Sequence, residues 1–352
     1  MRKTLKILRK ILFWIFFVGL FLVTTLTVIL YVYEDEIKQF AIDELNEHLT
    51  THVDVEDIQL SIFHDFPYAS IEFEHIFIPD AYPDLDSKDT LFYANSMFFN
   101  FNIWDIYSGD YKVKRISVHD GTYQMKTTAE GQINYDIIEH TPDSLKKEDN
   151  FNFLLELLEV ENIHYSYTNL ASNQFYDLQI HEGLFQGDFS AEEYDLAAKA
   201  DLRINRLKSN SFNLVKNKEA NVDLNMAVIA ESKSYLFNKG DLTIEEMPFQ
   251  ITGVIDSSHL DLVLKGDNIQ IHDLANSLVD ESLEDVKTYE GEGVFNFEAR
   301  IEGDRSSLEM PAIDADFSVT HGSINEPEND LKIHEINFIG RYQNEQVNRK
   351  EQ

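Results

Sequence analysis

Residues 220–229, ANVDLNMAVI, decide the fold class, because apolar side chains alternate in them with polar or small ones. Val222, Leu224, Met226 and Val228 take every second position. This period of two is typical of a β-strand that has one covered face and one face in water. It favours an antiparallel sheet, since the strands of a parallel sheet are buried on both faces and are apolar throughout.

The same alternation recurs over most of the chain beyond residue 51. Runs with this period contain Ile71, Phe73, Phe99, Phe101, Ile133, Tyr135, Ile163, Tyr165, Ala200, Leu202, Ile204, Leu260, Leu262, Leu264, Phe295, Phe297, Phe317 and Val319. Glycine-containing turn signals separate the runs, among them His119-Asp120-Gly121, Asn238-Lys239-Gly240, Lys265-Gly266-Asp267 and His321-Gly322. The pattern predicts about 16 to 20 short strands in a sheet that twists and curls, so that its apolar face forms a trough.

Three other stretches carry the period of a helix. EDEIKQFAIDELNEHL, at 34–49, has apolar residues at three, four and eight positions beyond Ile37, which predicts a short amphipathic helix covered by the strands that follow. FNFLLELLEV from Phe151 and IHDLANSLVDESLEDV from Ile271 are predicted as short helices. We therefore expect a mainly β fold, in which a groove-like, elongated and curled antiparallel sheet contains a few short helices.

Residues 11–32, ILFWIFFVGLFLVTTLTVILYV, contain no charged side chain and would form about 33 Å of helix. Basic residues precede this stretch and acidic residues follow it, which predicts a single transmembrane helix with its N-terminus in the cytoplasm. Ile11 and Val32 bound this membrane anchor, and Trp14 and Tyr31 suit the two membrane interfaces. A cleaved signal peptide is the competing interpretation, but its apolar stretch is shorter and ends in a small-residue cleavage site, which does not follow here.

The charge of the chain restricts its partners. The net charge is −34, with 63 acidic and 29 basic residues. Such a field repels phosphate backbones, which argues against a nucleic-acid partner and against a domain that lies flat on an anionic membrane. Cysteine is absent, so disulfides, thiolate metal sites and a cysteine nucleophile are excluded.

No catalytic or metal-binding constellation is found in the sequence. The 12 histidines show no H-E-x-x-H motif. Asp84, Asp86 and Asp89 lack the glycine and the distant glutamate of a calcium loop, and are interpreted as an acidic surface loop. Gly291 and Gly293 lack the third glycine of a dinucleotide-binding turn. The sequence therefore predicts a protein that is not an enzyme and needs no cofactor.

The order of these features resembles the AsmA-like family of bacterial envelope proteins, which includes TamB-type proteins and is described with chorein-type lipid-transfer bridges. The anchor, the short helix and VDVEDIQLSIFHDFPYASIEFEHIFIPD, with its Phe66-Pro67 turn, resemble the N-terminal module of that family. GEGVFNFEARIEGD and PAIDADFSVTHGSINEPENDLKIHEINFIGRY resemble its later β repeats. Since family members are commonly much longer, the resemblance predicts that the chain is an N-terminal portion, and a fragment, of such a protein.

The resemblance implies a bacterial inner-membrane protein with a single span, whose bulk is a periplasmic β-groove that carries phospholipid toward the outer membrane. It implies phospholipid, the inner membrane and other envelope proteins as partners. The corresponding organisation is a cytoplasmic flank (1–10), the transmembrane helix (11–32), the short helix with a first β module (33–138), a polar loop or boundary (139–150) and continuing β-rich groove repeats (151–352).

The residues expected to line the groove lie on strands of the second half of the chain. They are Val222, Leu224, Leu260, Leu262, Leu264, Phe295 and Phe297. The same side chains would also be expected in an ordinary packed core, because a one-residue change of register exchanges the two faces of a strand. An alternative function is a non-enzymatic scaffold for outer-membrane protein assembly, with sheet edges that recruit a partner strand.

Overall fold

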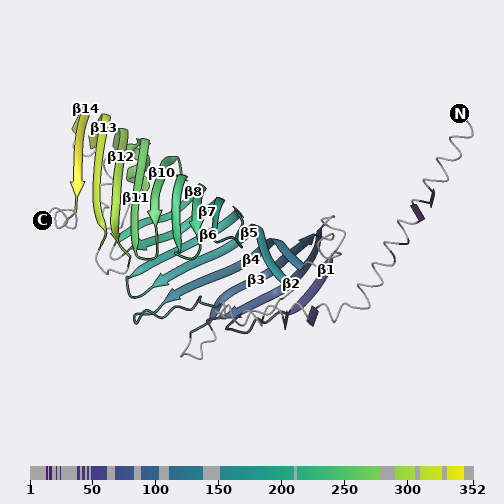
Figure 1. The fold of residues 1–352 in the computed structure, drawn as a ribbon. Helices are drawn as coiled ribbons and strands as arrows, with labels where there is room; N and C mark the ends of the chain where they lie inside the picture. The colour runs from purple at the N-terminus through teal and green to yellow at the C-terminus, as the bar shows by residue number, and fades with distance from the viewer. Residues whose placement is uncertain are drawn as a thin grey trace, which may run out of the picture.

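The computed structural model describes residues 49–61, 68–82, 89–102, 111–137, 151–209, 212–277, 290–305, 310–326 and 331–344, together with single positions between 13 and 46. These residues form one 14-stranded sheet, in which the order of the strands is their order in the sequence. The sheet is open and curled, with β1 at one edge and β14 at the other (Figure 1). The prediction of a mainly β chain with one curled sheet is confirmed.

The strands are longer and fewer than the sequence predicted. They are β1 (Asp57–Ser61), β2 (Tyr68–Pro79), β3 (Thr90–Asn102), β4 (Tyr111–Thr127), β5 (Phe151–Asn169), β6 (Gln174–Gln186), β7 (Glu193–Ser209), β8 (Phe212–Ile229), β9 (Ser234–Ile244), β10 (Met247–Ile255), β11 (His259–Gln270), β12 (Glu290–Asp304), β13 (Ala312–Glu326) and β14 (Leu331–Gln343). The longest of them has 19 residues.

Several predicted turns lie inside these long strands. Gly121, Gly240, Gly266 and Gly322 belong to β4, β9, β11 and β13, so the turns predicted at these four glycines are wrong. The register of β11 with β12 shifts between Gly266 and Ile269, where Asn268 has a φ of 59°. This is the signature of a β-bulge, which bends a strand without ending it. These glycine signals therefore mark irregularities within strands and not the turns between them.

Each strand is antiparallel to its neighbours, except that β4 and β5 run parallel. A parallel pair needs a connection that returns from the end of the first strand to the level at which it began. That connection includes the predicted boundary at 139–150, which lies outside the described residues.

The helix predicted from Phe151 is wrong, because FNFLLELLEV forms the first half of β5. Leu158 and Val160 pair with Ile116 and Val118 of β4, whereas Leu157 pairs with Arg115. A run so rich in leucine fits both the helical and the strand period. Pairing with β4, which only the tertiary structure provides, decides between the two.

Two helical predictions are supported by the described residues. Helix α3 (Ile271–Ser277) follows β11 directly, where the sequence predicted a helix from Ile271. Positions 38, 39, 42, 43 and 46 of the predicted amphipathic helix are helical. Ile42 and Leu49 pack against the buried cluster of the first strands, as the apolar stripe predicted.

The predicted membrane anchor falls mainly outside the described residues. Ile11, Tyr31 and Val32 are not described, while Trp14 is helical and exposed. No helix with the length and apolar character of a membrane span is found among the residues that the structure describes. The predicted Phe66-Pro67 turn also lies outside them.

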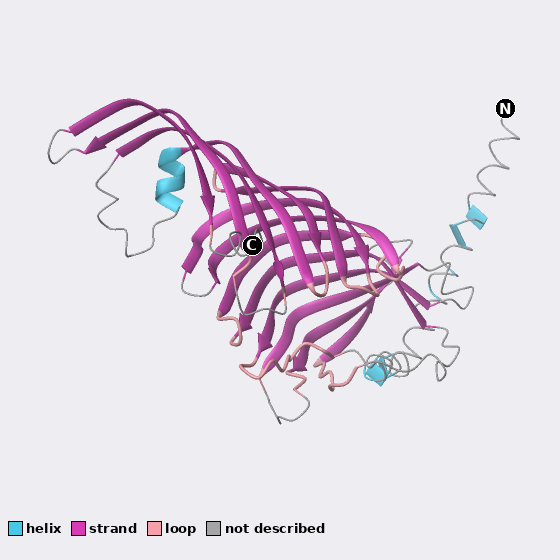
Figure 2. Cartoon of the chain, turned by 60° about the vertical axis from the view of Figure 1, so that its left-hand side comes forward, coloured by secondary structure: helices cyan, strands magenta, loops and turns pink. Residues whose placement is uncertain are grey.

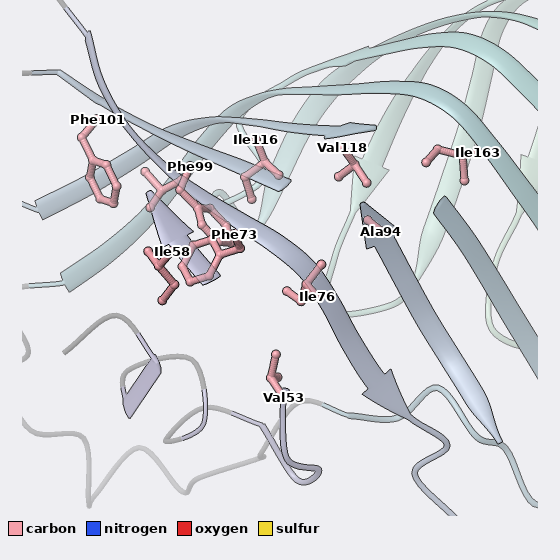
Figure 3. Packing of buried hydrophobic residues seen from close by; sticks show 11 residues of the cluster. Val53, Ile58, Phe73, Ile76, Ala94, Phe99, Phe101, Ile116, Val118 and Ile163 are labelled. Atoms are coloured by element: carbon pink, nitrogen blue, oxygen red, sulfur yellow. The ribbon is translucent and has the colours of Figure 1, made fainter. Parts of the chain in front are cut away.

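Two buried clusters lie along the sheet. The first joins β1 to β5 and includes Phe73 and Phe99, whose rings are 5.0 Å apart, together with Val53 from the segment before β1 (Figure 3). The second gathers Ile204, Ala220, Ile244, Met247 and Ile269 from five successive strands, β7 to β11. Helix α3 contacts both β8 and β12, because the sheet curls along its length (Figure 2).

Candidate functional site

One face of the sheet carries apolar residues in rows that cross all 14 strands without a polar interruption. Residues opposite one another in neighbouring strands project from the same face. The first apolar row contains Ile58, Phe73, Met97, Val118, Val160, Gly183, Ala200, Val222, Leu242, Phe249, Gly266, Phe297, Phe317 and Gly340.

A second apolar row runs beside the first, two residues along each strand. It contains Leu60, Ile71, Phe99, Ile116, Leu158, Phe185, Ala198, Leu224, Gly240, Ile251, Leu264, Ala299, Ala315 and Tyr342. The glycines make room for large neighbours, since a Cβ on Gly266 would clash with the rings of Phe297. The two rows form a continuous apolar band from one edge of the sheet to the other.

The opposite face is polar at the positions between the two rows. This polar row contains Gln59, Glu72, Phe98, Ser117, Glu159, Leu184, Lys199, Asp223, Asp241, Gln250, Lys265, Glu298, Asp316 and Arg341. Only Phe98 and Leu184 in it are apolar. Lys199 and Asp223 are 3.2 Å apart in an ion pair on this face. The sheet is therefore amphipathic over its whole length.

The apolar band is only partly covered within the described residues. The segment before β1 covers its first strands through Val53, and α3 adds Leu274 to the second buried cluster. Between and beyond these covers, Val160, Val222 and Leu264 are half-buried, although no second sheet lies on them. Neighbouring side chains on the curled face shield one another.

The structure brings together the residues predicted to line a groove. Val222 and Phe297 lie in the first apolar row, and Leu224 and Leu264 lie in the second. Leu262 belongs to the next row and pairs with Ile301.

Leu260 and Phe295 extend the same face toward the two ends of the strands. Leu260 pairs with Gly303, and Phe295 pairs with Ile269 at the bulge beside α3. The Phe295 ring is 5.7 Å from that of Phe297. All seven predicted residues are half-buried on one face, although they come from only three strands.

A cluster of tyrosines that the sequence did not single out lies on the apolar face. Tyr123 and Tyr165 pair in register between β4 and β5, and Tyr167 and Tyr176 pair between β5 and β6. Their ring centroids are 6.0 Å and 5.4 Å apart. Burial raises the pKa of Tyr165 to about 12, with a further contribution from the neighbouring tyrosines, so its hydroxyl keeps its proton at neutral pH. The alternation of Tyr165 and Tyr167 was visible in the sequence, but their partners in β4 and β6 were not.

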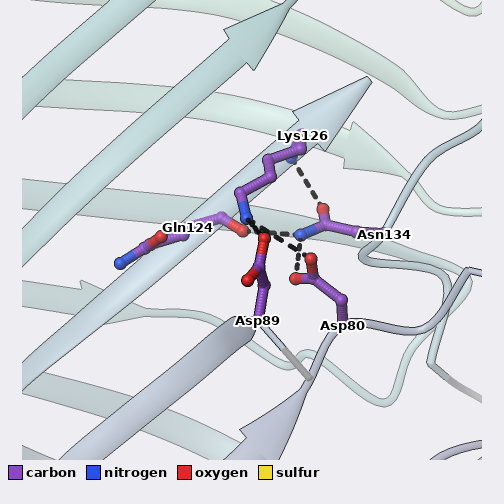
Figure 4. A network of polar contacts seen from close by, with 5 residues as sticks. All are labelled: Asp80, Asp89, Gln124, Lys126 and Asn134. Atoms are coloured by element: carbon purple, nitrogen blue, oxygen red, sulfur yellow. Dashed lines mark hydrogen bonds and ion pairs between the residues drawn. The ribbon is translucent and has the colours of Figure 1, made fainter. Parts of the chain in front are cut away.

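A buried polar network fixes the segment that follows β4. Asn134 is fully buried; its amide donates to Asp80 Oδ1 at 2.6 Å and to the Gln124 carbonyl at 2.9 Å (Figure 4). Lys126 Nζ lies 3.3 Å from Asp80 and 3.1 Å from Asp89, and the two carboxylates raise the pKa of the lysine against the opposing effect of burial. Each buried polar group of this network has a partner, so its role is structural.

The described residues offer little to catalysis. No group of three or more histidine, aspartate or glutamate side chains that could hold a metal ion occurs among them. A shallow hollow of about 710 Å³ lies at the ends of β6 to β9, where Asp188 and Asp195 lie beside Leu196 and Met226. Its lining is mixed, since Glu156, Gln186, Asn225 and Asn238 also contribute to it. The extended apolar band is thus the candidate functional site.

No protein-family model, no curated protein and no solved structure matches the chain.

Proposed function

We propose that the chain binds phospholipid through acyl chains that lie on the apolar band, and that it conducts lipid between the inner and outer membranes of a bacterium. In this proposal it is a single-pass inner-membrane protein, and the sheet stands in the periplasm and supports outer-membrane biogenesis. The observation that carries the proposal is the pair of apolar rows, to which all 14 strands contribute.

The length of the apolar band favours the binding of several lipids, one after another along the band, over the binding of a single ligand. At about 4.8 Å per strand, 14 strands span roughly 60 Å along the sheet. Half of a bilayer core, which one acyl chain crosses, measures about 15 Å. A small-molecule site would instead be a closed cavity with a few convergent polar groups. A band of this length with no polar interruption suits a path along which chains slide.

The charge of the chain supports the same proposal. The polar row contains six acidic and three basic residues, in a protein with a net charge of −34. An acidic exterior keeps an amphipathic sheet soluble and holds it away from anionic membrane surfaces. The sheet then stands between membranes instead of lying on one.

Photocrosslinking in cells tests the proposal. A photoreactive residue at Leu262 or Phe297 projects from the apolar face, whereas one at Asp261 projects from the polar face, where Asp261 accepts hydrogen bonds from Arg300 at 2.7 Å and 2.9 Å. Mass analysis is expected to identify phospholipid captured from the apolar positions and none from Asp261. Capture of no lipid at any of the three positions would refute the proposal.

A scaffold for outer-membrane protein assembly is the second candidate, and the edge strand β14 favours it. Among the described residues no strand pairs with the outer side of β14. Phe338 is 47% exposed, Ile339 is 88% exposed and Tyr342 is 54% exposed. An exposed edge of this kind can accept a strand from another protein. Photocrosslinking from Asn337, with Thr252 inside the sheet as control, is expected to trap a protein neighbour if this function holds.

A further inference from the structure

We propose that one long rim of the apolar band, formed by the tyrosine cluster, the β5–β6 turn and the β7–β8 hairpin, binds the phosphate of the lipid headgroup. This inference rests on the proposed function and assigns an orientation to the bound lipid. The acyl chains lie across the apolar rows, and the headgroup lies at this rim and not at the opposite one.

The apolar face changes in character along β5 and β6 as it approaches this rim. Along β5, Ile163 is followed on the same face by Tyr165, then Tyr167, then Asn169. On β6 the paired residues change in the same order, from Ile180 through Leu178 and Tyr176 to Gln174. Hydrocarbon thus gives way to phenol and then to amide. Rings with a hydroxyl at one end are the side chains that suit a boundary between acyl chains and water.

The phenols at this rim have hydrogen-bonding capacity to spare. Tyr165 donates to the sulfur of Met125 at 3.5 Å, and thioether sulfur is a weak acceptor. Among the described residues, the hydroxyls of Tyr123 and Tyr176 have no hydrogen-bond partner, and neither is a fully buried atom. Protonated phenols that face a ligand can donate to the oxygens of a phosphate.

The β7–β8 hairpin at the same rim is basic. Residues 202–218, which span the β7–β8 hairpin, contain five basic residues and no acidic one: Arg203, Arg206, Lys208, Lys216 and Lys218. Lys218 pairs in register with Ile204 on the apolar face. Lys208 pairs in register with Phe175 on the polar face, and its Nζ reaches the β5–β6 turn at the rim, where it lies 3.4 Å from Asn173 Oδ1. The ammonium group of Lys208 therefore lies beside the strand ends that carry the tyrosines.

Two acidic residues on the strands beside this hairpin are engaged with other groups, and Glu245 of the neighbouring β9–β10 turn accepts from the Glu219 backbone amide at 3.2 Å, while Glu246 next to it is exposed. Glu219 forms an ion pair with Arg203 at 2.9 Å. Asp177 accepts hydrogen bonds from Asn205 at 2.8 Å and from His164 at 2.9 Å. Among the described residues, Lys208, Lys216 and Lys218 form no ion pair. Of the three, only Lys218 projects from the apolar face, because Lys208 pairs with Phe175 and Lys216 with Arg206 on the polar face.

At the opposite rim, the connection between β6 and β7 has the reverse charge. Residues 187–195, between β6 and β7, contain Asp188, Glu192, Glu193 and Asp195 and no basic residue. A phosphate there would meet four carboxylates, whereas at the β7–β8 hairpin it meets lysines. The difference in charge across the apolar band selects the rim at which an anionic headgroup lies.

Competitive lipid binding to the purified full chain tests the inference. Native mass spectrometry is carried out in the presence of equal amounts of dioleoyl phosphatidylglycerol and dioleoylglycerol, which share acyl chains and differ in the phosphate. The wild-type chain is expected to retain the phospholipid at least about tenfold more than dioleoylglycerol. The double variant Lys208→Gln/Lys218→Gln is expected to lose most of this preference, and Tyr165→Phe/Tyr176→Phe to lose part of it. Retention of dioleoylglycerol is expected to stay unchanged in both.

Matched controls remove the same groups elsewhere. Lys199→Gln/Lys239→Gln removes two lysines that pair with Asp223 and Asp241 on the polar face. Tyr194→Phe/Tyr235→Phe removes two hydroxyls near the opposite rim, where Tyr194 and Tyr235 both pair with Val228. Both controls are expected to keep the wild-type preference. All variants share the N-terminal segment, so lipid that associates with it cancels in the comparison.

The outcomes separate this inference from the proposed function. If the wild-type chain retains neither lipid, the proposed function fails and the inference with it. If it retains both lipids equally, or if the controls lose the preference as much as the rim variants, the inference fails while acyl-chain binding stands.

If glycerol phosphate alone displaces the phospholipid, the rim is a site for soluble phosphates. If the rim variants change only co-sedimentation with phosphatidylglycerol vesicles, the lysines contact a membrane surface. Either of the last two results overturns the inference.

Discussion

Leu224 of β8 and Ile251 of β10 meet over Gly240, the residue of β9 that pairs with both of them. A Cβ at Gly240 would lie 2.7 Å from Leu224 Cδ2 and closer still to Ile251 Cγ2. The side chains of Leu224 and Ile251 therefore fill the space above Gly240. The second apolar row stays continuous across β9 because Gly240 has no side chain that would push them apart.

Replacement of Gly240 by alanine is expected to destabilise the sheet by about 1–3 kcal/mol, because the added methyl group overpacks this part of the row. The free energy of unfolding in urea measures the effect. Asn225→Ala, at an exposed position of the same hairpin, is the control and is expected to change stability by less than about 0.5 kcal/mol. Equal stability of the Gly240→Ala variant and the wild type would contradict the packing described here.

A charge within the apolar band is expected to interrupt lipid binding. In Leu264→Asp a carboxylate would replace an apolar side chain in the second row, and burying it beneath acyl chains costs several kcal/mol. We expect the phospholipid retained by the purified chain to fall at least about tenfold. Thr252→Asp places the same charge on the exposed side of β10 and is expected to leave retention unchanged. Parallel circular dichroism spectra would show that both variants are folded.

The polar network after β4 is expected to contribute strongly to stability. Asn134→Ala removes two hydrogen-bond donors and the acceptor for the Lys126 backbone amide at 2.7 Å, and it leaves the buried Asp80 carboxylate with fewer partners. The expected cost is about 2–4 kcal/mol. Glu130→Ala, in the exposed turn between β4 and Asn134, serves as control. A variant as stable as the wild type in urea would show that the network adds nothing.

The tyrosine cluster is expected to make the fold sensitive to alkaline pH. The pKa of Tyr165 is about 12 in the folded chain against 10.0 for an ordinary tyrosine. Between these values the unfolded chain releases the proton while the folded chain holds it, so the stability present below pH 10 is lost as pH rises toward 12. Tyr165→Phe is expected to show a weaker loss over this window in urea unfolding at a series of pH values. An unchanged slope would mean that Tyr165 is not responsible.

The last pair of strands is expected to loosen in acid. Arg341 donates to Asp314 from both Nε, at 2.8 Å, and Nη2, and this lowers the pKa of Asp314 to about 2. The lowered pKa contributes stability above the ordinary value of 3.8, and this stability is lost as pH falls through 2. The measurement is the protection of the β14 amides from hydrogen exchange, corrected for the intrinsic pH dependence of exchange. As pH rises over this window, protection is expected to increase less in Arg341→Gln than in the wild type. The same steepness in the wild type and the variant would refute the role of this ion pair.

The sequence predicted where strands occur in this protein better than it predicted the residues at which they begin and end. Alternation identified the strands around Val222, Leu262 and Phe297, and all three residues lie on the apolar face of the sheet. The glycine at 266 was taken as a turn, because a glycine between polar residues has the same local signature in a turn and in a β-bulge. Only the pairing of β11 with β12 on both sides of the bulge distinguishes them.

The tyrosine cluster and the basic hairpin show what the sequence left unassigned. Tyr123 is 42 residues before Tyr165 in the chain, and no local pattern places it beside Tyr165 and Tyr176. Lys208 reaches Asn173 across a hairpin because of the register of β6 with β7. Register follows from the turns and bulges of each strand together, so it is a property of the pairing and not of one segment.

The sequence by itself determined an amphipathic, mainly β chain, because a period of two assigns every second side chain to one face wherever a strand forms. The tertiary structure decided that these faces join into one apolar band across 14 strands, with a parallel pair at β4 and β5 and a strand in place of a predicted helix. The physical reason is that backbone hydrogen bonds between strands fix which residues lie opposite one another, and a single strand carries no record of its partner's register.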